Sequence, residues 1–160
     1  MQQQILNLIN QRFFTDEEVL GLGPEAVPAL IALFDEIVSN EMGTQRQAIV
    51  HMLGLLDGDQ AVEFLKVLYH QLAGQDETLQ IAVLSALART DHEAALALVL
   101  PLLETGEKRV RKNAIVGLRH TRRPVVLDKV KKCAQSDPDP SLRRYAEGIA
   151  AEIEEHLHKD

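Results

Sequence analysis

Residues 110–118 read VRKNAIVGL, and related versions of this nine-residue pattern occur three more times in a chain of 160 residues. Arginine stands second in most copies, and apolar or small residues follow at the spacing of one helix face. The copies begin at residues 45, 79, 110 and 142, so their starts are 34, 31 and 32 residues apart. This regular separation predicts an internal repeat.

A second set of apolar residues keeps the same period. Val27, Val62, Ala95 and Val126 are 35, 33 and 31 residues apart, and each lies in the helical stretch that precedes one copy of the pattern. A pair of helices cannot bury its apolar faces alone, so successive pairs must stack on one another. The sequence therefore predicts an array of helical hairpins.

The composition also favours an all-α chain. Aromatic residues make up 4% of the sequence and tryptophan is absent, so Leu, Ala, Ile and Val must build the core. Leu and Ala favour helices, and no alternating β-branched run predicts a strand. We predict a single domain over 1–160, a right-handed α-solenoid with cap helices in 1–23 and hairpins at 24–57, 58–90, 91–122 and 123–157.

Start and stop signals delimit the helices. Thr15 with Glu18, and Thr90 with Glu93, have the spacing of a capping box, while Gly and Pro separate the apolar stretches. Pro101 lies inside one stretch, and we expect it to kink or shorten that helix. The expected helices span 2–13, a short helix from Thr15 through Leu20, 24–39, 43–56, 60–73, 77–89, 92–104, 108–120, 124–135 and a last one ending near 157.

The segment 137–146, DPDPSLRRYA, resembles the loop and second-helix start of short HEAT-like repeats, a form also known from phycobilin lyase subunits. The stretch 100–103, LPLL, which leads to Val110 and Arg111, looks the same. The resemblance covers about residues 24–155. It implies a protein-binding scaffold in which the second helices of the hairpins line the concave side.

The resemblance also implies a role for the repeated arginine, which in such repeats braces a neighbouring repeat through a loop carboxylate. Arg46, Arg111 and Arg143 match this position, whereas Gln80 departs from it. A planar guanidinium group forms paired hydrogen bonds with a carboxylate, which suits arginine to the contact. We expect these three arginines to be structural.

The charges are segregated along the chain. Residues 1–107 carry a net charge of −12, residues 108–144 carry +9, and residues 145–160 carry −4. In a linear array a block of sequence becomes a block in space, so we expect a basic patch toward one end of a groove with an apolar middle. The predicted partner-binding residues on the concave face are His51, Ile81, Leu84, Lys112, Val116, Arg119 and Arg144.

A basic patch beside an apolar groove favours a protein partner with acidic segments. Nucleic-acid binding through residues 108–144 is an alternative, although the acidic remainder repels a long polyanion and aromatic residues for base stacking are scarce. A bilin lyase-like or chaperone subunit is a second alternative, which the lyase relatives suggest. Self-association through the acidic end of another copy also stays open.

The sequence shows no motif for catalysis or metal binding. The six histidines form no zinc signature, and Cys133 continues an apolar helix stripe with Val126 and Val130. We therefore predict a non-enzymatic protein without cofactor or metal. A single cysteine, an N-terminus without a basic segment and the lack of an apolar run of about 18 residues suggest a cytoplasmic chain without a membrane span.

Overall fold

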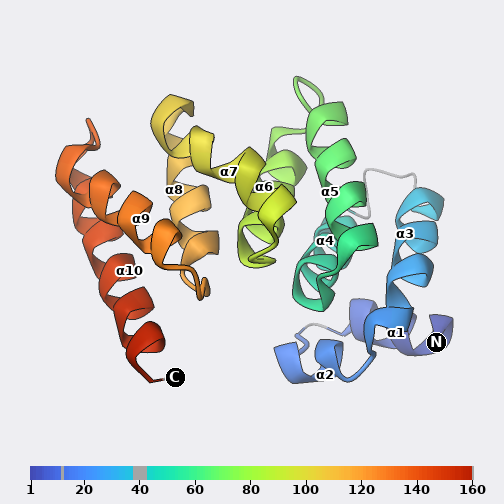
Figure 1. Ribbon diagram of the computed structural model, residues 1–160. Helices are drawn as coiled ribbons and strands as arrows, with labels where there is room; N and C mark the ends of the chain where they lie inside the picture. The colour runs from blue at the N-terminus through green and yellow to red at the C-terminus, as the bar shows by residue number, and fades with distance from the viewer. Residues whose placement is uncertain (12, 38–42, 160) are drawn as a thin grey trace.

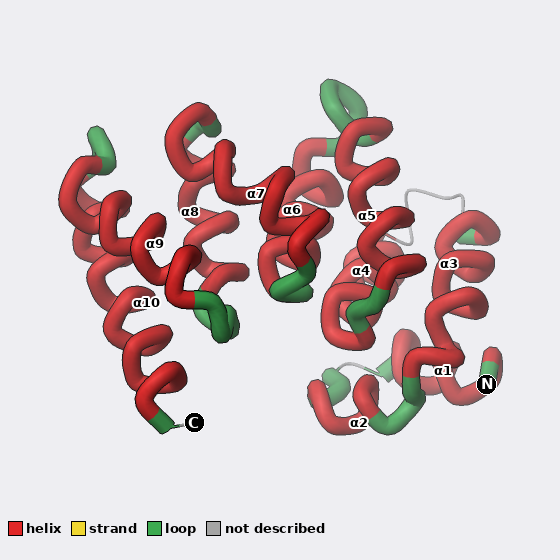
Figure 2. The backbone as a smooth tube through the Cα atoms, viewed as in Figure 1, coloured by secondary structure: helices red, strands yellow, loops and turns green. Residues whose placement is uncertain are grey.

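The computed structural model describes residues 1–11, 13–37 and 43–159, and within them the chain forms helices joined by short loops, without a strand (Figure 2). The described helices are α1 Gln2–Asn10, α2 Asp16–Leu20, the 3-10 helix η1 Pro24–Ala26, α3 Val27–Glu36, α4 Gly43–Leu56, α5 Asp59–Gln71, α6 Glu77–Arg89, α7 Glu93–Thr105, α8 Lys108–Leu118, α9 Pro124–Ser136 and α10 Pro140–His158.

From α3 onward the helices alternate between two rows (Figure 1). In one row α4 packs on α6, α6 on α8 and α8 on α10, while α3, α5, α7 and α9 pack in order along the other. The cap helices α1 and α2 pack at the end formed by α3 and α4, and the two chain termini lie at opposite ends of the molecule. The predicted all-α solenoid is confirmed.

One continuous apolar core lies between the two rows and runs from Ile5 in α1 to Ile153 in α10. Its largest fully buried side chains include Leu30, Leu53 and Leu87. Each hairpin buries its apolar face against the next hairpin, so the stack rather than the single hairpin is the stable unit.

Two glycines bring α4, α6 and α8, which lie in one row, unusually close together. A Cβ atom built on Gly54 of α4 would lie 2.9 Å from the Cβ atom of Ala86 in α6. A Cβ atom built on Gly117 of α8 would lie 2.5 Å from the Cβ atom of Ala88 and 2.8 Å from the carbonyl oxygen of Ser85, both in α6. Small residues therefore set the spacing of α4, α6 and α8.

Hydrogen bonds between loops hold consecutive hairpins in register. Thr121 Oγ1 donates to Oδ1 of Asp91 at 2.6 Å, and Arg123 Nε donates to the Asp91 carbonyl oxygen at 3.0 Å. Asp91 has a φ of 54°, a left-handed conformation that aspartate tolerates better than most residues. These bonds fix the start of α9 against the start of α7.

The capping box of Thr15 and Glu18 is confirmed. The Glu18 N–H donates to Thr15 Oγ1 at 3.2 Å, and the Thr15 N–H donates to the Glu18 carboxylate at 2.7 Å. The helix predicted at 77–89 has the same bounds in the structure, whereas α1 ends three residues before the predicted 13 because Gln11 is already extended. The predicted helix end at Ser39 lies outside the described residues.

The second predicted capping box is wrong. The N-cap of α7 is His92, whose Nδ1 accepts a hydrogen bond from the Ala94 N–H at 3.2 Å. Thr90 instead donates to the carbonyl oxygen of Leu87 at 2.8 Å and so closes the end of α6. Pro101 does not shorten α7, which continues through it to Thr105.

Candidate protein-binding face

The structure places the predicted concave-face residues on the row formed by α4, α6, α8 and α10. His51 lies on α4, Ile81 on α6 and Val116 on α8, while Arg119 is the C-cap residue directly after α8. All four side chains are half-buried. Lys112 on α8 and Arg144 on α10 are exposed. This row therefore presents both apolar and cationic groups to solvent.

Leu84 does not belong to this surface, because its side chain is fully buried. It lies one residue before Ser85, which does face the open side of α6. A shift of one residue turns a helical side chain by about 100°, so Leu84 packs into the core instead. The prediction of Leu84 as a partner contact is wrong.

A hollow of about 360 Å³ lies across α4, α6 and α8. Its floor consists of small groups, because Ala82, Ser85 and Ala86 of α6 meet Gly117 of α8 there. The remaining residues that line it are larger, and several carry charge or titrate: Gln47, His51, Arg89, Val116, Arg119 and His120. We call this hollow and its lining residues the groove.

Carboxylates of the chain itself lie at two places on the groove. Asp16 of α2 accepts a hydrogen bond from Arg89 Nη2 at 2.5 Å and lies 3.5 Å from His51 Nε2. Glu152 of α10 lies 3.2 Å from Arg119 Nε. Desolvation alone would raise the pKa of Asp16, but the charge and hydrogen bond of Arg89 hold that pKa below its usual range.

Cationic and titratable side chains gather along the groove, where Arg89, Arg119 and His120 line the same hollow. Partial loss of hydration and the charges of Arg89, Arg119 and His156 lower the pKa of His120, and Asp16 only partly opposes them. Desolvation is the largest cause of this shift, and the charges of Arg89 and Arg119 add to it. The groove is therefore suited to an anionic group.

At least half of the basic residues in the block 108–144 pair with carboxylates of other helices and loops. Their ion pairs connect the third and fourth hairpins with each other and with the loop before α7, and they are not a continuous free patch. The pairs are Lys108–Asp139, Arg111–Asp137, Arg119–Glu152, Arg123–Asp91, Lys131–Glu154 and Lys132–Glu104. At least six of the twelve basic residues in the block thus have internal counter-ions, and Lys112 lies 5.9 Å from the ring centre of Tyr145.

The three arginines of the repeat make different contacts. Arg111 forms paired hydrogen bonds with the Asp137 carboxylate in the loop after α9. Arg143 Nη1 donates to the carbonyl oxygen of Asp137 at 2.6 Å. Arg46 lies over the ring of Phe34, 4.6 Å from its centre. At the equivalent position, Gln80 donates to the carbonyl oxygen of Tyr69 at 3.0 Å.

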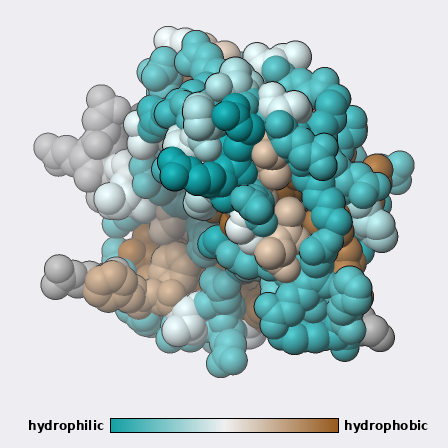
Figure 3. Space-filling model, turned by 90° about the vertical axis from the view of Figure 1, so that its left-hand side faces the viewer, coloured by the Kyte–Doolittle hydropathy of each residue, from teal (hydrophilic) through white to brown (hydrophobic). Residues whose placement is uncertain are grey.

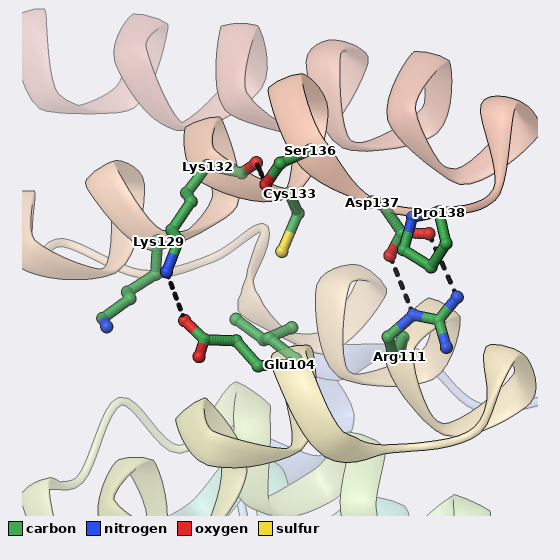
Figure 4. Close-up of a pocket in the computed structure, with 9 residues that line it drawn as sticks. Glu104, Arg111, Lys129, Lys132, Cys133, Ser136, Asp137 and Pro138 are labelled. Atoms are coloured by element: carbon green, nitrogen blue, oxygen red, sulfur yellow. Dashed lines mark hydrogen bonds and ion pairs between the residues drawn. The ribbon is translucent and has the colours of Figure 1, made fainter.

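A smaller pocket of about 170 Å³ lies between α7 and α9 (Figure 4). The Cys133 thiol points into it, between the Glu104–Lys132 pair and the Arg111–Asp137 pair. Burial raises the pKa of this thiol, so the reactive thiolate is disfavoured. The pocket therefore lacks an activated nucleophile at Cys133.

In residues 1–11, 13–37 and 43–159, no three metal-binding side chains come together. None of the helices described for the chain is both long and apolar enough to cross a membrane.

Viewed from the side of α9 and α10, the surface is mostly hydrophilic, with hydrophobic surface exposed at the lower left (Figure 3).

Three residues at the groove, Arg89, His120 and Asp16, were not among the residues predicted from the sequence. Arg89 and His120 both end up on the groove and are 31 residues apart, which is one repeat period. Their shared position near the ends of α6 and α8 was the available signal. Asp16 carried no such signal, because only the folded cap brings α2 to α6.

Paired helices that stack in two rows around one core, with one row lining a groove, define an α-solenoid repeat protein. The model of the HEAT-repeat family matches residues 65–150, and the chain belongs to this family. HEAT repeats generally act as scaffolds for protein interactions and are typically non-catalytic. No match was found among curated proteins or solved structures.

Proposed function

We propose that this chain is a non-catalytic adaptor that binds an extended acidic segment of a partner protein in the groove. Four hairpins, 24–57, 58–90, 91–122 and 123–157, form the scaffold of this proposal, and 1–23 is its cap. A cytoplasmic location belongs to the same proposal. The groove is the observation that most strongly supports the proposed adaptor function.

The shape of the groove supports a peptide ligand. Ala82, Ser85, Ala86 and Gly117 keep its floor low over two neighbouring helices, so side chains of a bound segment have room to enter. Apolar contact there supplies affinity through the area removed from water. Ile81 and Val116, which are half-buried on the same row, extend the apolar surface.

The charge of the groove supports an acidic ligand. Arg89, Arg119 and His120 line one hollow, so two guanidinium groups and an imidazole face the same space. Carboxylates of a partner would steer toward these groups and fix the register of binding. The wide pairing of the 108–144 cations argues against the nucleic-acid alternative, because paired cations have fewer counterions to release. No observation favours the bilin lyase-like alternative.

Fluorescence anisotropy with a labelled glutamate peptide tests the proposal, with a glutamine peptide of equal length as the control. We expect the glutamate peptide to bind at about 50 mM salt and to weaken at about 200 mM. Absence of binding at low salt, or equal binding of the glutamine peptide, would overturn the acidic-segment proposal.

Two pairs of variants locate the binding. Ser85→Phe fills the hollow and should weaken binding at least about tenfold. Ala97→Phe, at an exposed position of α7 outside the groove, should not weaken it. Arg119→Glu should also weaken it, whereas Lys129→Glu makes the same charge change on α9 and should not. Circular dichroism confirms that each variant is folded, and equal effects within either pair would place the binding elsewhere.

A further inference from the structure

The carboxylate of Asp16 reaches the groove from a distant part of the chain. Asp16 is separated from Arg89 by 73 positions, and yet its Oδ2 lies 2.5 Å from the guanidinium group. Its Oδ1 lies 3.5 Å from His51 on the neighbouring helix. One carboxylate thus contacts two of the cationic or titratable groups that line the groove.

The local structure of α2 does not require this contact. Thr15 caps the helix, and Glu18 completes the capping box. Val19 anchors the helix by full burial in the core. Asp16 and Glu17 share the first turn and both are exposed, but in the described part of the chain only Asp16 forms ion pairs with groove residues. Asp16 is the acidic residue of this turn that meets the groove cations.

We propose that Asp16 weakens the binding of the acidic segment, because its carboxylate already contacts Arg89 and His51, the groups that an acidic side chain of the segment would approach. This inference rests on the proposed function. It identifies the α4–α6 end of the groove as a carboxylate subsite, and it assigns Asp16 the role of lowering the affinity of that subsite.

Charge and geometry explain why competition does not require α2 to leave. Arg89 uses Nη2 for Asp16, and its guanidinium group carries five N–H donors in all. A ligand carboxylate in the hollow can therefore share Arg89, but it then lies close to the negative charge of Asp16. Two like charges about 4 Å apart in a hydrated site repel by about 1 kcal/mol, which is about a fivefold change in affinity.

The test compares Asp16→Asn with Glu17→Gln. Asn keeps the size of the side chain and an oxygen acceptor for Arg89 but removes the charge. We expect Asp16→Asn to bind the glutamate peptide about fivefold more tightly than the unmodified chain, with no gain for the glutamine peptide. Glu17→Gln, which removes the same charge from the same helical turn, should change the affinity less than about twofold.

Asp16→Glu supplies a second check, because it keeps the charge and should leave the affinity unchanged. Unchanged or weaker binding by Asp16→Asn, or an equal gain from Glu17→Gln, would overturn the inference while leaving the proposed function intact. If the unmodified chain and both neutralised variants all fail to bind the glutamate peptide, the proposed function falls and the inference falls with it.

Discussion

Arg111 on α8 donates two parallel hydrogen bonds to the carboxylate of Asp137, which lies in the loop after α9. Arg111 Nε lies 2.8 Å from Oδ2 and Nη2 lies 3.0 Å from Oδ1. The Asp137 side chain is 1% exposed and that of Arg111 is 12% exposed. Arg111 Nη1 also donates to the Gly106 carbonyl oxygen at 2.8 Å, so one side chain joins the α7–α8 loop of the third hairpin to the α9–α10 loop of the fourth.

We predict that Arg111→Ala destabilises the fold by about 3 kcal/mol, because it leaves the Asp137 carboxylate buried without its partner. Urea denaturation followed by circular dichroism measures the loss. Arg109→Ala is the matched control, since Arg109 lies on the same helix but is exposed. Similar losses in the two variants would refute the bracing role of Arg111.

The same ion pair predicts a dependence on pH. The hydrogen bond from Arg111 holds the pKa of Asp137 below its usual range. A depressed folded-state pKa adds stability above the unfolded value, about 3.9, and this stability is lost as the pH falls through the folded pKa. The stability gap between the unmodified chain and Arg111→Ala should therefore be widest above about pH 5 and shrink toward pH 2. A gap that widens in acid would contradict this cause.

Two glycine substitutions should act in opposite directions. Gly117→Ala places a methyl group 2.5 Å from the Cβ atom of Ala88, so we expect a loss of about 1–3 kcal/mol. Gly148 lies inside α10, with no atom within 4 Å of a built Cβ, so Gly148→Ala should gain about 0.5–1 kcal/mol from helix propensity. Thermal unfolding of both variants checks the pair, and a stabilising Gly117→Ala would show that α6 and α8 are not closely packed.

The paired basic block leads to a prediction about nucleic acid. Because six cations of 108–144 already have carboxylate partners, we expect no measurable binding to a generic DNA duplex at about 50 mM salt. Anisotropy with a labelled duplex provides the measurement. Binding that falls steeply with salt would revive the nucleic-acid alternative.

The repeat in the sequence was enough to predict the helical array, because apolar spacing and helix caps are local properties. It also selected Arg111, whose contact with a loop carboxylate has the implied geometry. The register within α6 was less certain from the pattern, and one position separates the buried Leu84 from the groove residue Ser85.

The partners of the charged residues could not be read from the sequence. The charge blocks suggested a free basic patch, but stacking brings Glu104, 28 positions before Lys132, to within 2.7 Å of it. The contact of Asp16 with Arg89 depends in the same way on how the cap folds back on α4 and α6. Such pairings follow from the three-dimensional stack, because residues far apart in the chain meet only there.

Methyl NMR tests the central claim most directly. With alanine methyl groups labelled, the glutamate peptide should shift the signals of Ala82 and Ala86, which line the groove, and leave those of Ala97 on α7 and Ala134 on α9 unchanged. Shifts confined to Ala97 and Ala134, or no shift at a saturating peptide concentration, would contradict binding of an acidic segment in the groove.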